Sequence, residues 1–226
     1  GRTIRPEPNV LQKRMFAHYR KCQMEDVACK MVILKPRQKG ASTCAQALTY
    51  HHMRKYPDLA GSLMGDISGT SDKVFEIYRR YAENDQFPWD EEGANLENGG
   101  NLVDLIKLKS GSVYGKETAG SKNAGRSGTV QVGNMTEVAF WPMAGAKDPA
   151  LGYLQSLYDG DSVSLCVADS TPNGPAGWFY RTWVQDNDWA KIFAAWFEFD
   201  DSRVPFRTPD DLKEFEDTLT DDEKSE

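Results

Sequence analysis

Short apolar runs alternate along the chain with longer segments in which apolar residues recur at helical spacing. A short apolar run bounded by turn residues is typical of a buried strand, and a spacing of three to four residues is typical of a helix. The apolar runs predict strands over residues 28–34, 59–67, 129–133, 163–168 and 192–199. The helical spacing predicts helices over residues 10–19, 42–55, 71–84, 148–158 and 177–185. Because the two kinds of element alternate, the expected fold class is α/β, with a mostly parallel central sheet flanked by helices.

The middle of the chain interrupts this alternation. Residues 85–101 are polar and rich in glycine and asparagine, which predicts a loop. The segment LIKLKSGSVYGKE, at residues 105–117, predicts a hairpin that turns at its central Ser-Gly pair. Further on, the apolar residues 138–141 are expected to extend the apolar layer of the sheet.

Charge is distributed unevenly and marks the end of the apolar pattern. The formal net charge is −7, and the nine acidic residues and two lysines from Asp210 onward account for all of it. The rest of the chain is neutral and can still present a basic edge, so the charge does not exclude a nucleic-acid partner. The sequence therefore predicts one domain over residues 1–206 and an acidic linker or hinge over residues 207–226.

Two further observations limit the class of protein. The chain contains no run of about 20 apolar residues, so a transmembrane helix is not expected. The four cysteines contain no CxxC spacing, which suits a reducing compartment better than a disulfide framework. The cysteine spacing therefore favours a protein of the cytosol.

The first candidate site is the segment at residues 35–43, within the sequence LKPRQKGASTCAQ. A phosphate-binding loop needs a strand that aims it, a glycine that permits close approach, and a helix N-terminus behind the phosphates. Gly40 and Ser42 follow a predicted strand in the required order, and a hydroxyl at the start of the helix can bind magnesium. Ala41 occupies the position of the usual lysine, which leaves Lys35 and Lys39 as candidates to reach the phosphates. A basic strand-to-helix turn without a nucleotide is the alternative.

The second candidate is Glu137, in the sequence TVQVGNMTEVAFWP at residues 129–142. A carboxylate at the carboxyl edge of a parallel sheet is well placed to face a phosphate loop and to polarise an attacking water. Many P-loop enzymes carry an aspartate directly before this glutamate to hold magnesium, and here that position is Thr136. An ordinary glutamate at the edge of the sheet is the alternative.

Two more segments contribute polar groups. In CVADSTPNGPAGWFYRTW, at residues 166–183, Thr171 and Asn173 can contact a γ-phosphate or a water, although the segment alone reads as a turn. In GSKNAGRSGT, at residues 120–129, Arg126 can stabilise transition-state charge or be a solvated loop charge. Predicted strand ends after residues 34, 133 and 168 thus all deliver groups suited to one phosphate site.

Taken together, the segments LKPRQKGASTCAQ, GRSGTVQVGNMTEVAFWP and ADSTPNGPAGWFYRTW resemble the ATPase domain of large terminase subunits, the motors that package DNA into viral capsids. The resemblance spans roughly residues 10–200. It implies a RecA-like P-loop NTPase fold with an additional catalytic glutamate, and ATP and Mg²⁺ as cofactors. It also implies double-stranded viral DNA, a portal protein and a small terminase subunit as partners. A ring of five copies on the capsid, a monomer for the isolated domain, and a location in the host cytoplasm without membrane association are expected.

The resemblance assigns roles to positions of this sequence. It implies catalytic roles for Glu137, Lys35, Arg37 and, acting on a neighbouring subunit, Arg126. It implies that Gln12 recognises adenine and that the ATP phosphates bind Lys35, Pro36, Arg37, Gln38, Lys39, Gly40, Ala41, Ser42 and Thr43. The resemblance also implies that Thr171, Asn173 and Gly174 couple hydrolysis to movement. It implies that Ser42 and Thr136 bind the metal. Some terminases carry the loop lysine at the start of the motif, which makes Lys35 the first candidate and Lys39 the second.

Two other functions remain open at this point. One is another nucleic-acid translocase or helicase-like P-loop ATPase. The other is a non-catalytic DNA-binding or portal-binding module with a degenerate nucleotide site, which Ala41 and Thr136 would suit. Full-length terminases also carry a nuclease domain, for which this chain is too short, so nuclease activity is not expected. The acidic segment is then expected to be the hinge toward that domain.

Overall fold

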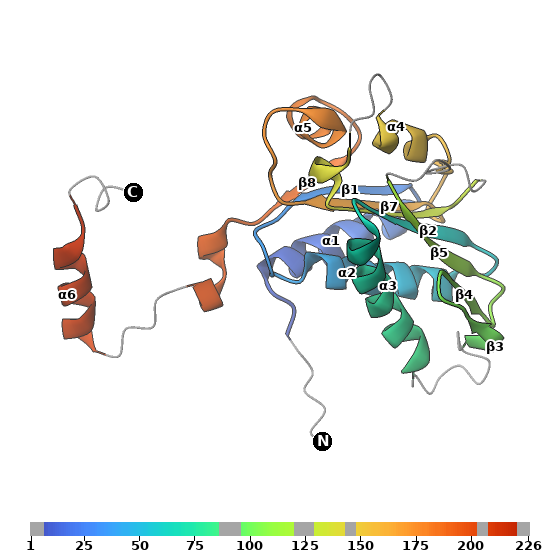
Figure 1. Cartoon of the computed structure of the whole chain (residues 1–226), viewed down its shortest axis with the longest axis horizontal. Coiled ribbons are helices and arrows are strands. Elements are labelled where there is room, and N and C mark those ends of the chain that lie inside the picture. The colour runs from blue at the N-terminus through green and yellow to red at the C-terminus, as the bar shows by residue number, and fades with distance from the viewer. Residues whose placement is uncertain (1–6, 86–95, 120–128, 143–147, 203–207, 221–226) are drawn as a thin grey trace. The chain divides into compact units, whose positions relative to one another are not determined.

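An eight-stranded sheet with helices on both faces is the central feature of the computed structural model (Figure 1). The structure describes residues 7–85, 96–119, 129–142, 148–202 and 208–220. The chain divides into two compact units, Gly1–Ala194 and Ala195–Glu226. The first unit contains the whole sheet. In the described part of the chain, no helix combines the length and the apolar character that crossing a membrane requires.

The strands follow the order β3-β4-β5-β2-β6-β7-β1-β8 across the sheet. All neighbouring pairs from β5 to β8 in this order are parallel, whereas β3, β4 and β5 pair antiparallel at one edge. Every residue of β6 and β7 is buried, as expected for central strands covered on both faces. The bounds are β1 (Cys29–Leu34), β2 (Ala60–Gly65), β3 (Leu96–Asn101), β4 (Leu105–Leu108), β5 (Val113–Thr118), β6 (Val132–Thr136), β7 (Leu165–Ser170) and β8 (Ala190–Phe193).

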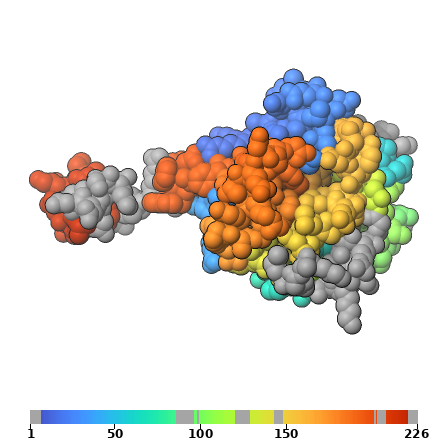
Figure 2. All heavy atoms as spheres, turned by 90° about the horizontal axis from the view of Figure 1, so that it is seen from above, coloured from blue at the N-terminus to red at the C-terminus, as the bar shows by residue number. Residues whose placement is uncertain are grey.

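Helices form one layer on each face of the sheet (Figure 1). One face is covered by α1 (Val10–Glu25), α2 (Ala41–Lys55) and α3 (Ser68–Glu83). The other is covered by the short 3₁₀ helix η1 (Val138–Phe140), α4 (Pro149–Leu154) and α5 (Gly177–Val184). Figure 2 views this second side, where α4 in yellow and α5 in orange form much of the outer surface. The second unit contains η2 (Trp196–Glu198), η3 (Asp200–Ser202) and α6 (Pro209–Thr218).

A cluster of aromatic side chains fixes the segment that follows β6. Trp141 is buried against Tyr153, and its indole N–H donates to the carbonyl of Thr136 at 3.0 Å. Trp178 and Phe179 of α5 belong to the same core, together with side chains of β1, β2, β6 and β7. Burying an aromatic side chain of this size stabilises the fold by about 1.5–3 kcal/mol. The residue between β6 and η1 is therefore held on both sides by packed structure.

The predicted fold class is confirmed, and so is the hairpin at residues 105–117. β4 and β5 pair antiparallel, and Gly111 adopts a positive φ of 84° in the turn between them. The prediction of a loop over residues 85–101 is wrong at its end, because Leu96–Asn101 forms the edge strand β3. Its glycines and asparagines read as turn residues, but antiparallel pairing to β4 supplies hydrogen bonds that composition does not reveal.

Several other boundaries differ from the sequence-based ones. The strand expected at 129–133 is Val132–Thr136, and the one expected at 163–168 is Leu165–Ser170. Residues 138–140 form the 3₁₀ helix η1, and Val138 and Trp141 are buried in the core beside the sheet, so this segment extends the apolar layer as expected. The strand expected at 192–199 ends at Phe193, and residues 196–198 form η2. The acidic linker expected over residues 207–226 stays a prediction.

Candidate nucleotide site

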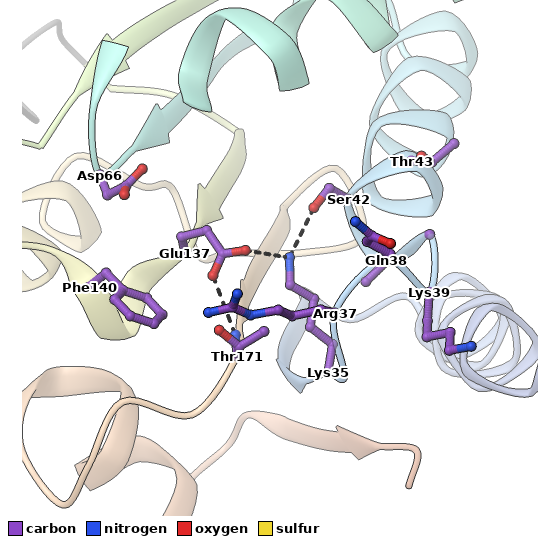
Figure 3. A pocket seen from close by; sticks show the side chains of 12 residues that line it. Lys35, Arg37, Gln38, Lys39, Ser42, Thr43, Asp66, Glu137, Phe140 and Thr171 are labelled. Carbon is purple, nitrogen blue, oxygen red and sulfur yellow. Dashed lines mark hydrogen bonds and ion pairs between the residues drawn. The ribbon is translucent and has the colours of Figure 1, made fainter. Parts of the chain in front are cut away.

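The carboxyl ends of three central strands meet at one edge of the sheet. The parallel register aligns Leu34 of β1 with Ser170 of β7, and Asp169 of β7 with Thr136 of β6. A cavity of about 490 Å³ lies at this edge, where ligands bind in open α/β sheets. Its wall consists of residues 37–43 with Lys35, Glu137 and Thr171, and of Asp66 and Phe140 (Figure 3).

The loop between β1 and α2 is held in an unusual backbone conformation. Gly40 caps α2 with a φ of 70°, and Gln38 also has a positive φ of 61°. The positive φ of Gly40 favours glycine, because a residue with a side chain is strained in this conformation. The loop carbonyls accept from the first turn of α1, since Asn9 donates to Lys39 at 2.9 Å and Gln12 donates to Gly40 at 3.2 Å. This conformation leaves the N-terminus of α2 facing the cavity, which suits an anion.

Lys35 places its ammonium group in the middle of the site. The Nζ atom forms ion pairs with Asp169 and, at 3.2 Å, with Glu137, and it donates to Ser42 Oγ at 3.1 Å. Burial alone lowers the pKa of Lys35, but the charges of Asp169 and Glu137 outweigh burial and raise the pKa above its ordinary value. In Figure 3 the side chain of Lys39 points away from this cluster. Of the two lysines left open by the sequence, Lys35 therefore has its charge at the centre of the site.

Glu137 adopts a backbone conformation that is uncommon for a residue with a side chain. Its φ is 53° and its ψ is 41°, which lies in the left-handed region and costs about 1–3 kcal/mol. Its second carboxylate oxygen accepts from the N–H of Thr171 at 3.4 Å and lies 3.5 Å from the hydroxyl of Ser170. Strained residues of this kind cluster at functional sites. The strain here turns the Glu137 carboxylate toward both Lys35 and the end of β7.

Asp169 belongs to the same cluster and was missed by the sequence analysis. It lies on β7, is only 2% exposed, and accepts from Ser42 Oγ at 3.2 Å in addition to its ion pair with Lys35. An acidic residue inside an otherwise apolar strand is rarely buried without a partner, which is the signal that was available in the sequence VADS. Asp66, which follows β2, and Phe140 were missed as well, because their segments carry no recognisable motif.

The predicted site residues separate into three groups. Lys35, Glu137, Thr171 and all of residues 37–43 line the cavity. Gln12 lies behind the loop, while Asn173 donates to the carbonyl of Ala139 at 2.9 Å and Gly174 forms a turn with a φ of 78°. Pro36, Asn173 and Gly174 are not among the residues that line the cavity. Arg126 lies outside the described residues.

Thr136, a predicted metal-binding residue, is 1% exposed. Its hydroxyl oxygen has no hydrogen-bond partner among the described residues.

The oxygen atoms at this edge suit a magnesium ion. Mg²⁺ prefers one or two carboxylates or hydroxyls together with substrate phosphates and water. Ser42 and Asp169 offer adjacent oxygens, and the described cluster of Lys35, Asp169 and Glu137 carries one excess negative charge at neutral pH. The residues that are present therefore fit a magnesium–nucleotide complex.

The order of strands and the glycine loop between β1 and α2 define the fold as that of a P-loop NTPase. Solved structures with this fold include the ATPase domain of the large terminase of Thermus phage P74-26, which is 16% identical. That match covers 96% of this chain and 95% of the other, with a TM-score of 0.55. The large terminase of a thermophilic bacteriophage is 12% identical over 97% of this chain, with a TM-score of 0.59. An ADP complex of the same large terminase is 11% identical over 83% of this chain and 45% of the other, with a TM-score of 0.60.

These similarities concern the fold. The chain spans 49% of the length of the full large terminase that it matches. By sequence, no protein-family model matches the chain, and no curated protein matches it either.

Proposed function

We propose that this chain is the ATP-hydrolysing motor domain of a viral large terminase, which drives double-stranded DNA into a procapsid. One observation carries the proposal. Lys35, Ser42 and Glu137 converge at the carboxyl edge of a parallel sheet, behind a glycine loop, in a fold shared with large terminase ATPase domains. A degenerate, non-catalytic site would have no reason to hold Glu137 in a strained conformation that faces the lysine.

The chemistry that these residues can perform is hydrolysis of a phosphoanhydride bond. The N–H groups at the start of α2 bind the phosphates, and Lys35 and Arg37 offset the negative charge that develops on them. Ser42 would hold Mg²⁺, which when bound neutralises charge on the β- and γ-phosphate oxygens. Glu137 accepts a hydrogen bond from the attacking water and aligns it with the γ-phosphate. Gln12, next to the loop, recognises the adenine.

Coupling to movement is proposed for the segment that follows β7. The Thr171 N–H contacts the Glu137 carboxylate, and Asn173 donates to the backbone two residues after Glu137. When the γ-phosphate leaves, Glu137 and Lys35 lose their interactions with it and can move. The hydrogen bonds from Thr171 and Asn173 then transmit this movement to the segment that contains Gly174. The segment is thus suited to move a DNA-gripping surface in step with hydrolysis.

The partners follow from the same proposal. They are double-stranded viral DNA, a portal protein and a small terminase subunit, in the cytoplasm of the host. Five copies form a ring on the capsid, in which Arg126 of one copy acts on the site of the next. The isolated domain is monomeric and hydrolyses ATP slowly, because such an arginine needs a neighbour.

ATP turnover by Glu137→Gln tests the proposal. The substitution keeps the shape of the side chain and removes the carboxylate, so hydrolysis should fall by about 10²–10⁴-fold. Binding of ATP, measured by calorimetry, should change little. Glu97→Gln, at an exposed position of the edge strand β3, is the matched control and should hydrolyse ATP like the wild type.

Unchanged turnover in Glu137→Gln would contradict the assignment. Separation of duplex strands by the wild-type chain, without any capsid component, would favour a helicase-like motor instead.

A further inference from the structure

Asp169 and Thr136 occupy neighbouring positions on adjacent strands, and only one of them is an acid. We propose that Asp169 supplies, from β7, the metal-site carboxylate that Thr136 cannot supply from β6. In this role Asp169 orients the hydroxyl of Ser42 and helps to hold the shell of the divalent cation that accompanies the nucleotide. The inference rests on the proposed nucleotide-hydrolysing function and adds a residue to it.

The register of the sheet allows a carboxylate on β7 to take the place of a carboxylate on β6. Asp169 pairs with Thr136 on one side and with Ile33 of β1 on the other. Residues in register on parallel strands point to the same face of the sheet, and adjacent strands lie about 4.8 Å apart. A carboxylate on β7 therefore has the same orientation as one on β6 and lies one strand closer to the loop that follows β1.

The hydroxyl of Ser42 is already arranged for a cation. A serine hydroxyl has one proton and two lone pairs. The proton is donated to Asp169 at 3.2 Å, and one lone pair accepts from Lys35 at 3.1 Å. The second lone pair remains for a cation. A carboxylate that fixes a ligand in this way is a typical outer partner of a metal site. The hydroxyl of Thr136 has no partner among the described residues and makes no such contact.

The charge of Asp169 gives a second and independent reason to expect a cation beside it. Asp169 is almost fully buried, and a buried carboxylate needs a compensating charge. Lys35 provides it, but Lys35 also pairs with Glu137. When nucleotide phosphates attract the ammonium group of Lys35, Asp169 loses part of its compensation. A cation that arrives with the phosphates restores it at the same place.

Measuring how strongly Mg²⁺ improves the binding of ADP tests the inference directly. The full chain is titrated with ADP by calorimetry, with Mg²⁺ and with a chelator in its place. In Asp169→Asn the improvement due to Mg²⁺ should shrink by about 10- to 100-fold, the usual effect of removing an outer partner of a metal site. Binding of Mn²⁺ in the presence of ADP, followed by electron paramagnetic resonance, should weaken by a similar factor.

A purely structural role for Asp169 predicts a different result. If Asp169 only positions Lys35, Asp169→Asn weakens ADP binding equally with and without Mg²⁺, and that outcome would overturn the proposal. Asp66→Asn removes another carboxylate from the cavity wall and serves as the comparison. An equal loss of the Mg²⁺ effect in Asp66→Asn would show that any carboxylate near the cavity has this effect through its charge. That outcome would also overturn the proposal.

An exchange of the two side chains separates this inference from folding and from the proposed function. The double variant Thr136→Asp with Asp169→Thr returns the carboxylate to β6 and should recover most of the Mg²⁺ effect. This double variant still tests the proposal if Asp169→Asn does not fold, as judged by circular dichroism. A folded exchange variant without a Mg²⁺ effect counts against the proposal. Failure of the wild-type chain to bind ADP under any condition would instead refute the proposed function itself.

Discussion

Strand β1 contains Lys30 and is followed directly by Lys35, and each of these lysines pairs with two carboxylates. Only Lys35 lies in a candidate site. Lys35, at the carboxyl end, pairs with Asp169 and Glu137. Lys30, near the other end, pairs with Asp159 and Asp188. In both cases burial lowers the lysine pKa, but the two acids raise it by more, so that the net direction is upward. The charges alone do not distinguish the two clusters.

The surroundings distinguish them. The carboxylate side chains of Asp159 and Asp188 are 53% and 67% exposed, whereas those of Asp169 and Glu137 are 3% and 27% exposed. Water screens the first cluster, and such exposed pairs contribute little to stability. The second is desolvated and lies beside a serine hydroxyl and the N-terminus of α2. A lysine with two acids therefore indicates a functional site only where burial and a ready anion-binding helix end accompany it.

The strongest test of this comparison removes each lysine in turn. Lys35→Met leaves two carboxylates without their cation in a buried place, which should cost about 3–5 kcal/mol and abolish ATP hydrolysis. Lys30→Met, the matched control in β1, should cost about 1 kcal/mol or less and leave hydrolysis intact. Urea unfolding and ATP turnover measure both effects. Similar losses of unfolding free energy in the two variants would show that the two lysine clusters do not differ in this way.

A smaller effect is expected from the loop that accompanies Lys35. Gly40→Ala forces a residue with a side chain into a left-handed conformation, so it should cost about 1–2 kcal/mol and weaken nucleotide binding. Gly69→Ala, in α3, is a suitable control because an added Cβ meets nothing within 4 Å and the backbone is helical. Thermal unfolding and ADP titration of the two variants give the comparison. Normal ADP affinity in Gly40→Ala would show that the loop conformation is not needed for phosphate.

The smallest expected effect is a difference in alkaline stability. The pKa of Lys35 is raised in the folded chain, so the folded state holds its proton where the unfolded state has lost it. The stabilisation is complete below the ordinary lysine pKa of 10.5 and is lost as the pH rises through the folded pKa.

The free energy of unfolding should therefore fall less for Lys35→Met than for the wild type as the pH rises above about 10.5 and through the folded pKa. Tyrosines titrate alike in both proteins, so the difference between the two slopes reports the lysine. Lys30→Met should show a smaller change that disappears in about 0.5 M salt, because exposed pairs are screened. Identical slopes in all three proteins would mean that neither cluster shifts its lysine.

Much of the fold follows from local sequence patterns. Alternating apolar runs and helical spacing suffice for the sheet and its flanking helices, because both periodicities are properties of single elements. The edge strand β3 could not be found in this way, since its residues carry turn-like composition and are ordered by pairing with β4. The end of β6 was displaced by three residues because the left-handed backbone of Glu137, which ends the strand, leaves no mark on composition.

The candidate site could be predicted from the sequence only in part, for a related reason. Spacing identified the glycine loop and Glu137, because their chemistry depends on order along the chain. It could not choose between Lys35 and Lys39, since the direction of a side chain depends on what surrounds it. It missed Asp169 altogether, because the relevant neighbour of Ser42 lies 127 positions away and is brought close by strand register.

The capping of the first helix has a consequence for the dynamics of the whole site. Asn9 and Gln12 cap α1 reciprocally, and the same two side chains hold the carbonyls of Lys39 and Gly40. Fraying of that first helical turn must release the loop, and ordering of the loop must suppress the fraying. Hydrogen exchange at the amides of this turn is thereby coupled to events in a cavity that the turn does not line. The first described helical turn is therefore expected to report whether the cavity is occupied.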